Sequence, residues 1–332
     1  MCIAVFLWQA HPLYPFLLLL NRDEYHSRPT KPLSWWGSGD QILGGRDEQA
    51  GGTWLACTRD GKIAFVTNVR ELESIPEAKS RGDLPIHFLM SNKSPKEFAE
   101  DLVKEANGYN GFNLILADIH SKSMVYITNR TKVGNNFITD VSPGIHVLPS
   151  SSLDSSWPKA QRLGHNFKDL LDKYGDSELP VNEMVEKLMM NTIKDEENML
   201  PKIYPAEFEH QLSSIFVDTD TPLGRYGTRS TSAVSVKSGG EVNFYERHLE
   251  NEKWLERTES FKIEMEQRVV QMPYIEDNGH KRKMAAHAKG NSTQADRQKM
   301  RKCWHIRNMF LRMLLLMLLL IDVIIIIIII IK

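Results

Sequence analysis

Residues 16–24, with the sequence FLLLLNRDE, decide how the N-terminal part of the chain folds, because an apolar run passes directly into four polar residues. A second apolar run, Cys2–Leu7, precedes it, and turn residues that include prolines separate the two. Short apolar runs between turn residues are typical of buried strands. We therefore predict a buried hairpin, in which the end of the second strand returns to the start of the first. This pairing brings Arg22 and Asp23 within reach of Cys2.

The rest of the sequence predicts further strands and helices. An Asp-Gly pair at residues 60–61 separates two apolar segments, which is typical of a tight β-hairpin. Ser94, Pro95 and Glu97 form a helix N-terminus with a capping box ahead of an amphipathic segment. The pattern also predicts strands at 112–117, 123–129, 144–148, 213–218, 228–236 and 242–249, and helices at 158–171 and 181–193. Strand pairs followed by helices favour an α+β fold with antiparallel sheets over a parallel doubly wound sheet.

Composition and charge exclude several classes of function. The chain has 332 residues, of which 42% are hydrophobic and 25% charged, and this is enough apolar material for a folded domain. Its 41 basic and 42 acidic side chains give a net charge of −1, so we expect no nucleic-acid partner. Three scattered cysteines, Cys2, Cys57 and Cys303, favour a reducing compartment. No basic n-region precedes the first apolar run, so we predict a cytoplasmic protein.

The C-terminal part of the chain differs in composition from residues 1–265, which we interpret as one globular domain. Residues 266–308 are basic and poor in apolar residues, which predicts a disordered linker. Residues 309–331 are almost wholly apolar and long enough to span a bilayer. Two interpretations stay open. The segment is either an anchor that contacts Golgi or other organelle membranes, with the basic linker on the cytoplasmic side, or a gene-model artefact. The eight consecutive isoleucines at 324–331 favour the artefact.

Position decides the chemistry that is available to Cys2. Removal of the initiator methionine leaves a cysteine with a free α-amine, so that a thiol and a base belong to one residue. Because an α-amine has a pKa of about 8, it can accept a proton from the thiol, whose pKa is about 8.5. The alternative is that Cys2 is a small apolar residue that only packs at the start of a buried strand.

The polar segment at residues 21–24 bears on this choice. A guanidinium lowers the pKa of a neighbouring thiol, and a carboxylate orients a neighbouring amine. Arg22 and Asp23 therefore suit a nucleophile at Cys2. The same segment also suits an ordinary turn, in which Asn21 ends the strand and the acidic residues cap the next segment.

Short motifs occur in order along residues 1–265: MCI at 1–3, NRDE at 21–24, WW at 35–36, GGRD at 44–47, GGTWL at 51–55, TNVR at 67–70, YNGFN at 109–113 and YGTRS at 226–230. With these motifs the chain resembles the transport and Golgi organisation family, also called the NRDE family. The basic linker and the apolar tail lie outside the resemblance.

The resemblance implies an N-terminal-nucleophile hydrolase-like fold, a four-layer αββα sandwich of two antiparallel sheets. It also implies a catalytic site. In that site Cys2 is the nucleophile and base, Arg22 and Asp23 hold the thiolate and the amine, Asn68 is an oxyanion donor, and Arg229 is a second arginine nearby. One departure alters the pattern. Where family members commonly carry an asparagine, this chain has Pro149-Ser150-Ser151, so that a hydroxyl has to take its place.

The resemblance further implies a role in Golgi organisation and secretory traffic, with handling of haem or lipid-like metabolites in a pocket centred on Cys2. Two interpretations stay open, because a fold alone does not determine a function. In one, the pocket binds and hands over a small amphipathic ligand of the haem or acyl-lipid type. In the other, Cys2 attacks an amide or thioester carbonyl and forms an acyl-enzyme. The sequence contains no metal-binding or nucleotide-binding motif, so we expect no cofactor and no metal site.

Other conspicuous residues receive structural interpretations. The Gly44-Gly45 and Gly51-Gly52 pairs predict bends between strands rather than phosphate loops. Trp35 and Trp36 either pack beneath a long loop or line the mouth of a ligand site. Cys57 is expected in the core. The remaining candidates are interpreted as surface or core histidines: His26, His87, His146 and His210.

Overall fold

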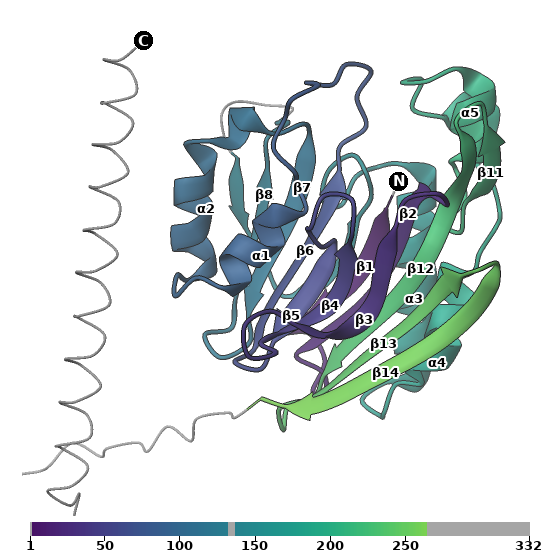
Figure 1. Ribbon diagram of the computed structural model, residues 1–332. Helices are drawn as coiled ribbons and strands as arrows, with labels where there is room; N and C mark the ends of the chain where they lie inside the picture. The colour runs from purple at the N-terminus through teal and green to yellow at the C-terminus, as the bar shows by residue number, and fades with distance from the viewer. Residues whose placement is uncertain (1, 132–136, 264–332) are drawn as a thin grey trace, which may run out of the picture. The chain divides into compact units, whose positions relative to one another are not determined.

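Figure 1 shows the computed structural model of the chain, which describes residues 2–131 and 137–263. The linker and the apolar tail expected at residues 266–331 lie outside these ranges, so both interpretations of the tail stay predictions. Within the described ranges, no helix is long and apolar enough to cross a membrane.

The predicted N-terminal hairpin lies inside a seven-stranded antiparallel sheet with the order β10-β1-β2-β12-β13-β14, in which β11 also pairs with β12. Every residue of the hairpin's first strand and the apolar part of its second strand are buried, which explains why both read as continuous apolar runs. The strands of this sheet are β1 (Ile3–Trp8), β2 (Phe16–Tyr25), β10 (Gly144–Leu148), β11 (Asp218–Thr221), β12 (Gly224–Val236), β13 (Glu241–Glu250) and β14 (Lys253–Lys262).

A second seven-stranded antiparallel sheet follows the order of the chain, from β3 to β9. Its Asp-Gly turn is confirmed: Gly61 has φ +88° between two paired strands. A glycine reaches this left-handed region without steric cost. The strands are β3 (Thr30–Trp36), β4 (Ile42–Asp47), β5 (Leu55–Thr58), β6 (Lys62–Asn68), β7 (Phe112–Asp118), β8 (Ser123–Thr128) and β9 (Ile138–Asp140).

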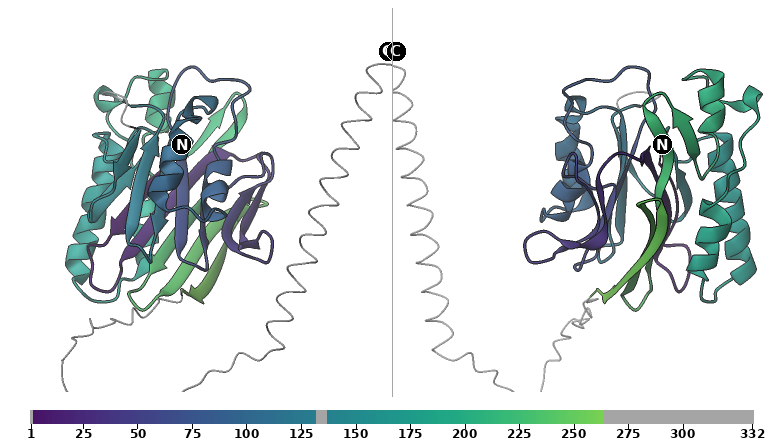
Figure 2. Two further views of the ribbon diagram at one scale, coloured as in Figure 1. Left: turned by 90° about the vertical axis from the view of Figure 1, so that its left-hand side faces the viewer. Right: turned by 45° about the vertical axis from the view of Figure 1, so that its right-hand side comes forward.

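The four-layer αββα arrangement is confirmed, with helices on the outer face of each sheet (Figure 2). Side chains of both sheets fill the space between them, and Phe6 and Phe65 meet there edge to face. Leu163 and Phe167 of one helix cover the first sheet. The helical segments are α1 (Asp83–Leu89), α2 (Pro95–Val103), α3 (Pro158–Tyr174), α4 (Val181–Met184) and α5 (Ala206–Gln211), together with short 3-10 or π turns at Ala106–Gly108, Val185–Met189 and Glu197–Met199.

The helix predicted at Ser94 begins where expected. Ser94 accepts a hydrogen bond from the Glu97 backbone, and the Glu97 carboxylate accepts one from the Ser94 backbone, which is a capping box. The helix predicted at 181–193 is shorter, because it passes into a π turn and ends at Met189.

Two predictions of local structure are wrong. Residues 213–217 form no strand, and β11 starts only at Asp218. Ile215 and Val217 are buried there as parts of a loop. The apolar residues of this segment therefore indicate burial but not a strand. The Gly44-Gly45 pair lies within β4, not in a bend. A Cβ at Gly45 would overlap the ring of Trp54, so that glycine is needed for a close approach between neighbours.

One buried acid joins the two sheets. Glu246 of β13 is 1% exposed, and its Oε2 accepts a hydrogen bond of 2.6 Å from the backbone of Leu33 in β3. Burial raises the pKa of this carboxyl group to about 7. The native state therefore holds a proton on Glu246 at a pH where the unfolded chain has released it.

We predict that Glu246→Gln changes how stability depends on pH. Because the pKa is higher in the folded state, this group costs the wild type stability as pH rises from about 4.5 to 7. The variant lacks this loss, so its free energy of unfolding, relative to wild type, should rise by about 2 to 3 kcal/mol between about pH 5 and pH 8. Urea unfolding at both pH values measures it. Parallel profiles for the two proteins would contradict the prediction.

Candidate functional site

Cys2 lines a cavity of about 640 Å³. Cys2 is a free cysteine, and the residue as a whole is partly exposed. Arg22, Asp23 and Asn68 line the same cavity, so the structure brings together most of the residues predicted to form the site. Arg229, also predicted, does not line it.

The register of the N-terminal hairpin places these residues. Ile3 lies opposite Asn21 in the β1–β2 pairing, so Arg22 and Asp23 follow beside Cys2. The whole polar segment lies within β2, which continues to Tyr25 and pairs with β12 on its other side. The interpretation of residues 21–24 as a turn is therefore wrong.

Asp23 is 5% exposed and is held in place by β12. Thr228 donates a hydrogen bond of 2.7 Å from its hydroxyl to Oδ1 of Asp23. The same hydroxyl accepts one of 3.0 Å from the Val217 backbone, which fixes its orientation. The carboxylate beside Cys2 is thus oriented by a neighbouring strand rather than by solvent.

Arg22 is held by an aromatic ring. Its guanidinium carbon lies 4.3 Å from the ring centroid of Trp54, a cation–π contact. The side chain is only 5% exposed, and no hydrogen bond joins its guanidinium to the described residues. Burial also lowers the pKa of Arg22 from its ordinary value. The N–H groups of the Arg22 guanidinium are therefore available to a ligand at the cavity wall.

The electrostatic surroundings of Cys2 act in opposite directions. Burial is the largest influence and raises the pKa of the thiol, and the charge of Asp23 raises it further. The charge of the N-terminal amine is the largest influence that lowers the pKa, and a hydrogen bond from the Asp23 backbone and then the charge of Arg22 lower it by less. The pKa stays above its ordinary value, so the thiol needs a nearby proton acceptor before it can act as a nucleophile at neutral pH.

Ser150 follows β10 and lies between Cys2 and Asn68. Its hydroxyl lies 3.1 Å from the Cys2 carbonyl oxygen and 3.1 Å from Oδ1 of Asn68. A hydroxyl has one proton, so it donates to one of these two oxygens at a time. Asn68 ends β6, and no hydrogen bond joins its Nδ2 to the described residues. That nitrogen is the group which could donate to a ligand carbonyl.

Arg229 neighbours Arg22 rather than Cys2. It sits where the β2–β12 register shifts, between Thr228 and Ser230. Its Nη1 donates a hydrogen bond of 3.3 Å to the Tyr25 carbonyl and another to that of Arg28. It lines a second cavity, together with Arg22 and Trp54. Arg229 therefore shares a cavity wall with Arg22, which also lines the Cys2 cavity.

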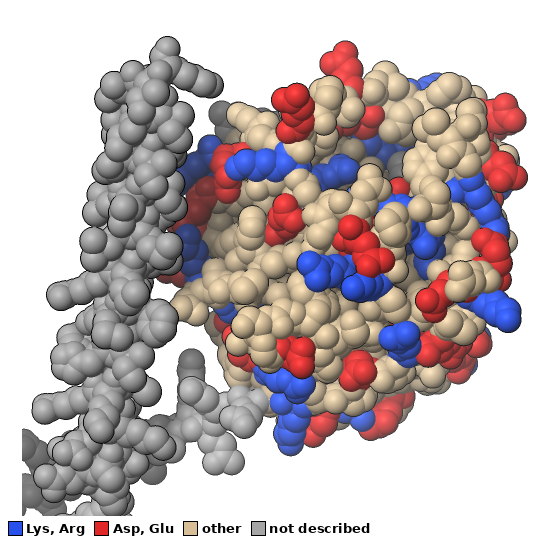
Figure 3. Space-filling model, in the orientation of Figure 1, with Lys and Arg blue, Asp and Glu red and all other residues tan. Residues whose placement is uncertain are grey.

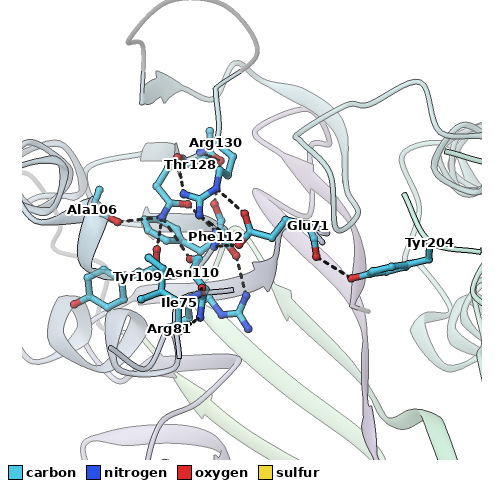
Figure 4. A network of polar contacts seen from close by, with 12 residues as sticks. Glu71, Ile75, Arg81, Ala106, Tyr109, Asn110, Phe112, Thr128, Arg130 and Tyr204 are labelled. Carbon is cyan, nitrogen blue, oxygen red and sulfur yellow. Dashed lines mark hydrogen bonds and ion pairs between the residues drawn. The ribbon is translucent and has the colours of Figure 1, made fainter. Parts of the chain in front are cut away.

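A polar network holds the loop that closes another side of the Cys2 cavity (Figure 4). Glu71 accepts a hydrogen bond of 2.7 Å from the Gly111 backbone and pairs with Arg130, also at 2.7 Å. Arg81 donates one of 2.8 Å to the Gly111 carbonyl. Gly82 packs against Gly52 with no room for a Cβ between their backbones. The loop that carries Arg81 is thus fastened to the strands on which the site is built.

The cavity is polar, with basic groups slightly in excess. Four cations, Arg22, Arg28, Lys79 and Arg81, line it against three carboxylates, Asp23, Glu24 and Asp47. Arg28 is neutralised by a two-pronged pair with Asp47, and Lys79 pairs with Glu105. On the face drawn in Figure 3, basic and acidic side chains are interspersed, so that face carries no large field of one sign outside the cavity.

Two residues around Cys2 were not identified from the sequence: Trp54 and Thr228. Both residues belong to motifs that the sequence showed, Trp54 to GGTWL and Thr228 to YGTRS. Their contacts, of Trp54 with Arg22 and of Thr228 with Asp23, exist only in the folded chain.

Other conspicuous residues serve the structure. His146 pairs with Asp154 at 2.8 Å, and Cys57 is 1% exposed in the core. Trp35 packs against Phe261, and neither it nor Trp36 lines the Cys2 cavity or the second cavity. The described part of the chain contains no group of three or more His, Cys, Asp or Glu side chains that could hold a metal ion.

Comparison with known proteins gives a consistent family match. Residues 1–251 match the family model described as Transport and Golgi organisation 2. The chain is 30% identical to the human Transport and Golgi organization protein 2 homolog and 29% identical to the mouse homolog, over 80% of this chain and all of each relative.

Solved structures with a similar arrangement include a mutant of the conjugated bile acid hydrolase from Clostridium perfringens. It has a TM-score of 0.42 and 12% identity, over 78% of this chain and 96% of that chain. Another is the Caenorhabditis elegans ortholog of N-acylethanolamine-hydrolyzing acid amidase, with a TM-score of 0.34 and 12% identity, over 70% and 92% of the two chains.

We predict that Cys2 reacts with iodoacetamide only when the pH exceeds the ordinary pKa of a thiol, because burial raises its pKa. Arg22→Gln should move the midpoint of the labelling rate to still higher pH, since it removes a charge that favours the thiolate. Peptide-resolved mass spectrometry follows each cysteine separately.

The matched control is Arg46→Gln, because Arg46 also lies over a tryptophan, 5.4 Å from the ring of Trp36, but does not line the cavity. This variant should keep the wild-type midpoint. An equal shift in both variants, or no shift in Arg22→Gln, would show that Arg22 does not act on the thiol.

Proposed function

Because the chain belongs to the transport and Golgi organisation 2 family, we propose that it serves Golgi organisation and secretory traffic from the cytoplasm by binding a small amphipathic metabolite in the Cys2 cavity. The ligand is of the haem or acyl-lipid type, with an acidic group at one end and an apolar body. The family match supports the cellular role, and the composition of the cavity wall supports the class of ligand.

The proposal rests mainly on the surroundings of Arg22. A buried guanidinium without a hydrogen bond from the described residues favours an acidic group as its partner, because a charged hydrogen bond away from bulk water stabilises a complex by roughly 1.5 to 3 kcal/mol. Arg81 lies on the same wall and donates one hydrogen bond, to Gly111, which leaves further N–H groups of its guanidinium for a ligand. Carboxylates and phosphates match the planar donor set of these arginines.

The same cavity offers a surface for an apolar body. Its wall includes four side chains that are largely or wholly apolar, namely Trp54, Val66, Pro76 and Ala78. Its volume of about 640 Å³ lies within the range of roughly 300 to 1,000 Å³ that is usual for small-molecule sites. A ligand with one acidic end therefore fits both kinds of lining.

A second candidate function is acyl transfer, which the assembly of Cys2, Asp23 and Asn68 on one cavity favours. The Cys2 sulfur would attack the carbonyl carbon of an amide or thioester, and its proton would pass by way of the α-amine to the departing amine or thiol. A water molecule would then cleave the acyl-enzyme thioester and release the acid. Asn68 Nδ2 would donate to the carbonyl oxygen as it becomes negative, and Asp23 would orient the α-amine.

The binding proposal is tested by titration with haemin and, separately, with oleate. Arg22→Gln should weaken binding of the active probe by about tenfold or more, since it removes a charged hydrogen bond. The control Arg46→Gln should bind as the wild type does, and Cys2→Ala should bind within about threefold, because the acidic end contacts Arg22 rather than the sulfur. Absorbance reports haemin and calorimetry reports oleate. Failure of both probes to bind, or equal binding by Arg22→Gln, would contradict the proposal.

The acyl-transfer candidate predicts a covalent intermediate. Incubation with a p-nitrophenyl acyl ester should add one acyl mass to the intact wild-type protein and none to Cys2→Ala. The adduct should map to Cys2 in a chain from which Met1 has been removed, because the base is the α-amine of Cys2. Intact mass spectrometry before and after the reaction gives both results. A mature protein that keeps Met1 would rule out this candidate and leave the binding proposal in place.

A further inference from the structure

A second cavity, of about 330 Å³, adjoins the Arg22–Trp54 pair. Arg22, Arg28 and Trp54 line both this cavity and the Cys2 cavity. The rest of the second wall comes from the segment after β2, from the β12 register shift and from β13. Its principal polar residues are His26, Arg229, Ser230, Glu246 and His248.

Several buried polar groups in this wall have no hydrogen-bond partner among the described residues. They are both ring nitrogens of His248, both ring nitrogens of His26, Nε of Arg229 and the hydroxyl of Ser230. His248 is only 6% exposed, and its nitrogens lie 3.7 and 3.8 Å from the carboxylates of Glu246 and Glu250, beyond hydrogen-bond distance. Leaving such a group unsatisfied costs about 1 to 3 kcal/mol, so a cluster of them is unusual in a wall with no ligand role.

Three arginines, Arg22, Arg28 and Arg229, and three acids, Glu246, Glu250 and Glu252, line this wall. Glu252 pairs with Arg225, and Glu250 is about half exposed, so an anion is favoured only beside the two arginines that lack an ion pair. Arg22 and Arg229 line the same cavity. Burial, and after it the charge of Arg22, lower the pKa of Arg229. Neither guanidinium forms an ion pair with a carboxylate among the described residues, whereas Arg28 is neutralised by Asp47. Glu246 is the one lining acid that is fully buried within the described chain, and it already accepts the hydrogen bond from Leu33.

We propose that this cavity is a second ligand site, which binds a small molecule through a terminal carboxylate or phosphate placed between Arg22 and Arg229, with Ser230 and His248 as further hydrogen-bonding groups. Two neighbouring guanidinium groups repel each other, and an oxyanion between them offsets this repulsion while it accepts a hydrogen bond from each. The volume restricts the ligand to a compact molecule, smaller than the amphipathic ligand proposed for the Cys2 cavity. The second site does not depend on that proposal.

Calorimetric titration of the full-length protein with inorganic phosphate and, in parallel, with acetate tests the site, at one fixed ionic strength so that general screening stays equal. At least one of the two probes should bind. A response to phosphate alone assigns a phosphate-bearing ligand, and a response to acetate alone assigns a carboxylate. No binding of either probe overturns the proposal.

Three variants locate the bound probe. Arg229→Gln should weaken binding by about tenfold or more. Arg247→Gln is the matched control, because Arg247 lies on β13 between Glu246 and His248 but contacts Met190 and Trp254 and does not line the cavity. It should bind within about threefold of wild type. Glu246→Gln should bind about threefold or more tightly at pH 8, where Glu246 has largely released its proton, since it then removes a buried negative charge near the anion. A variant that merely loosened the fold would not bind more tightly.

Equal affinity in wild type and Arg229→Gln, or no gain in affinity in Glu246→Gln, contradicts the proposed second ligand site.

Discussion

The antiparallel pairing of β1 with β2 places the charged groups that surround Cys2. A shift of that pairing by one residue would turn each side chain of β2 to the opposite face of its sheet. With Ile3 opposite Asn21, Arg22 and Asp23 follow beside Cys2, and β12 then holds Asp23 through Thr228. Because β2 is bonded to a strand on each side, its polar end is as firmly held as its apolar part, and these charged groups need no loop to position them.

Much of this arrangement could be predicted, and the exceptions have physical causes. The apolar runs of β1 and β2 are long and uninterrupted, so they identified the hairpin, and the capping box at Ser94 is a local signal that needs no tertiary contact. Cys2, Arg22, Asp23 and Asn68 came from motifs and meet in one cavity. The strand β14 was missed because most of its side chains are exposed and no alternating apolar face marks it. The bend predicted at Gly45 is wrong because the glycine makes room for Trp54, a contact that exists only in the folded sheet. Arg229, predicted near the site, lines the second cavity together with Arg22.

Arg22 is the residue on which the two proposals meet. It is buried, rests on Trp54 and lines both cavities, so a ligand in either one is within reach of the same guanidinium. An anion bound on the Arg229 side would draw this charge toward itself, and the thiol on the other side would lose part of the influence that favours its ionised form. If both proposals hold, the chemistry of Cys2 and the occupancy of the second cavity would be linked through this one side chain, without any movement of the sheets.

Gly45 supports that side chain indirectly. A Cβ at this position would overlap the indole of Trp54, the same ring that carries the guanidinium of Arg22. Even alanine would force the indole to tilt, and the cation resting on it would follow. A substitution here would thus disturb the shared wall of both cavities although every residue that lines them is still wild type.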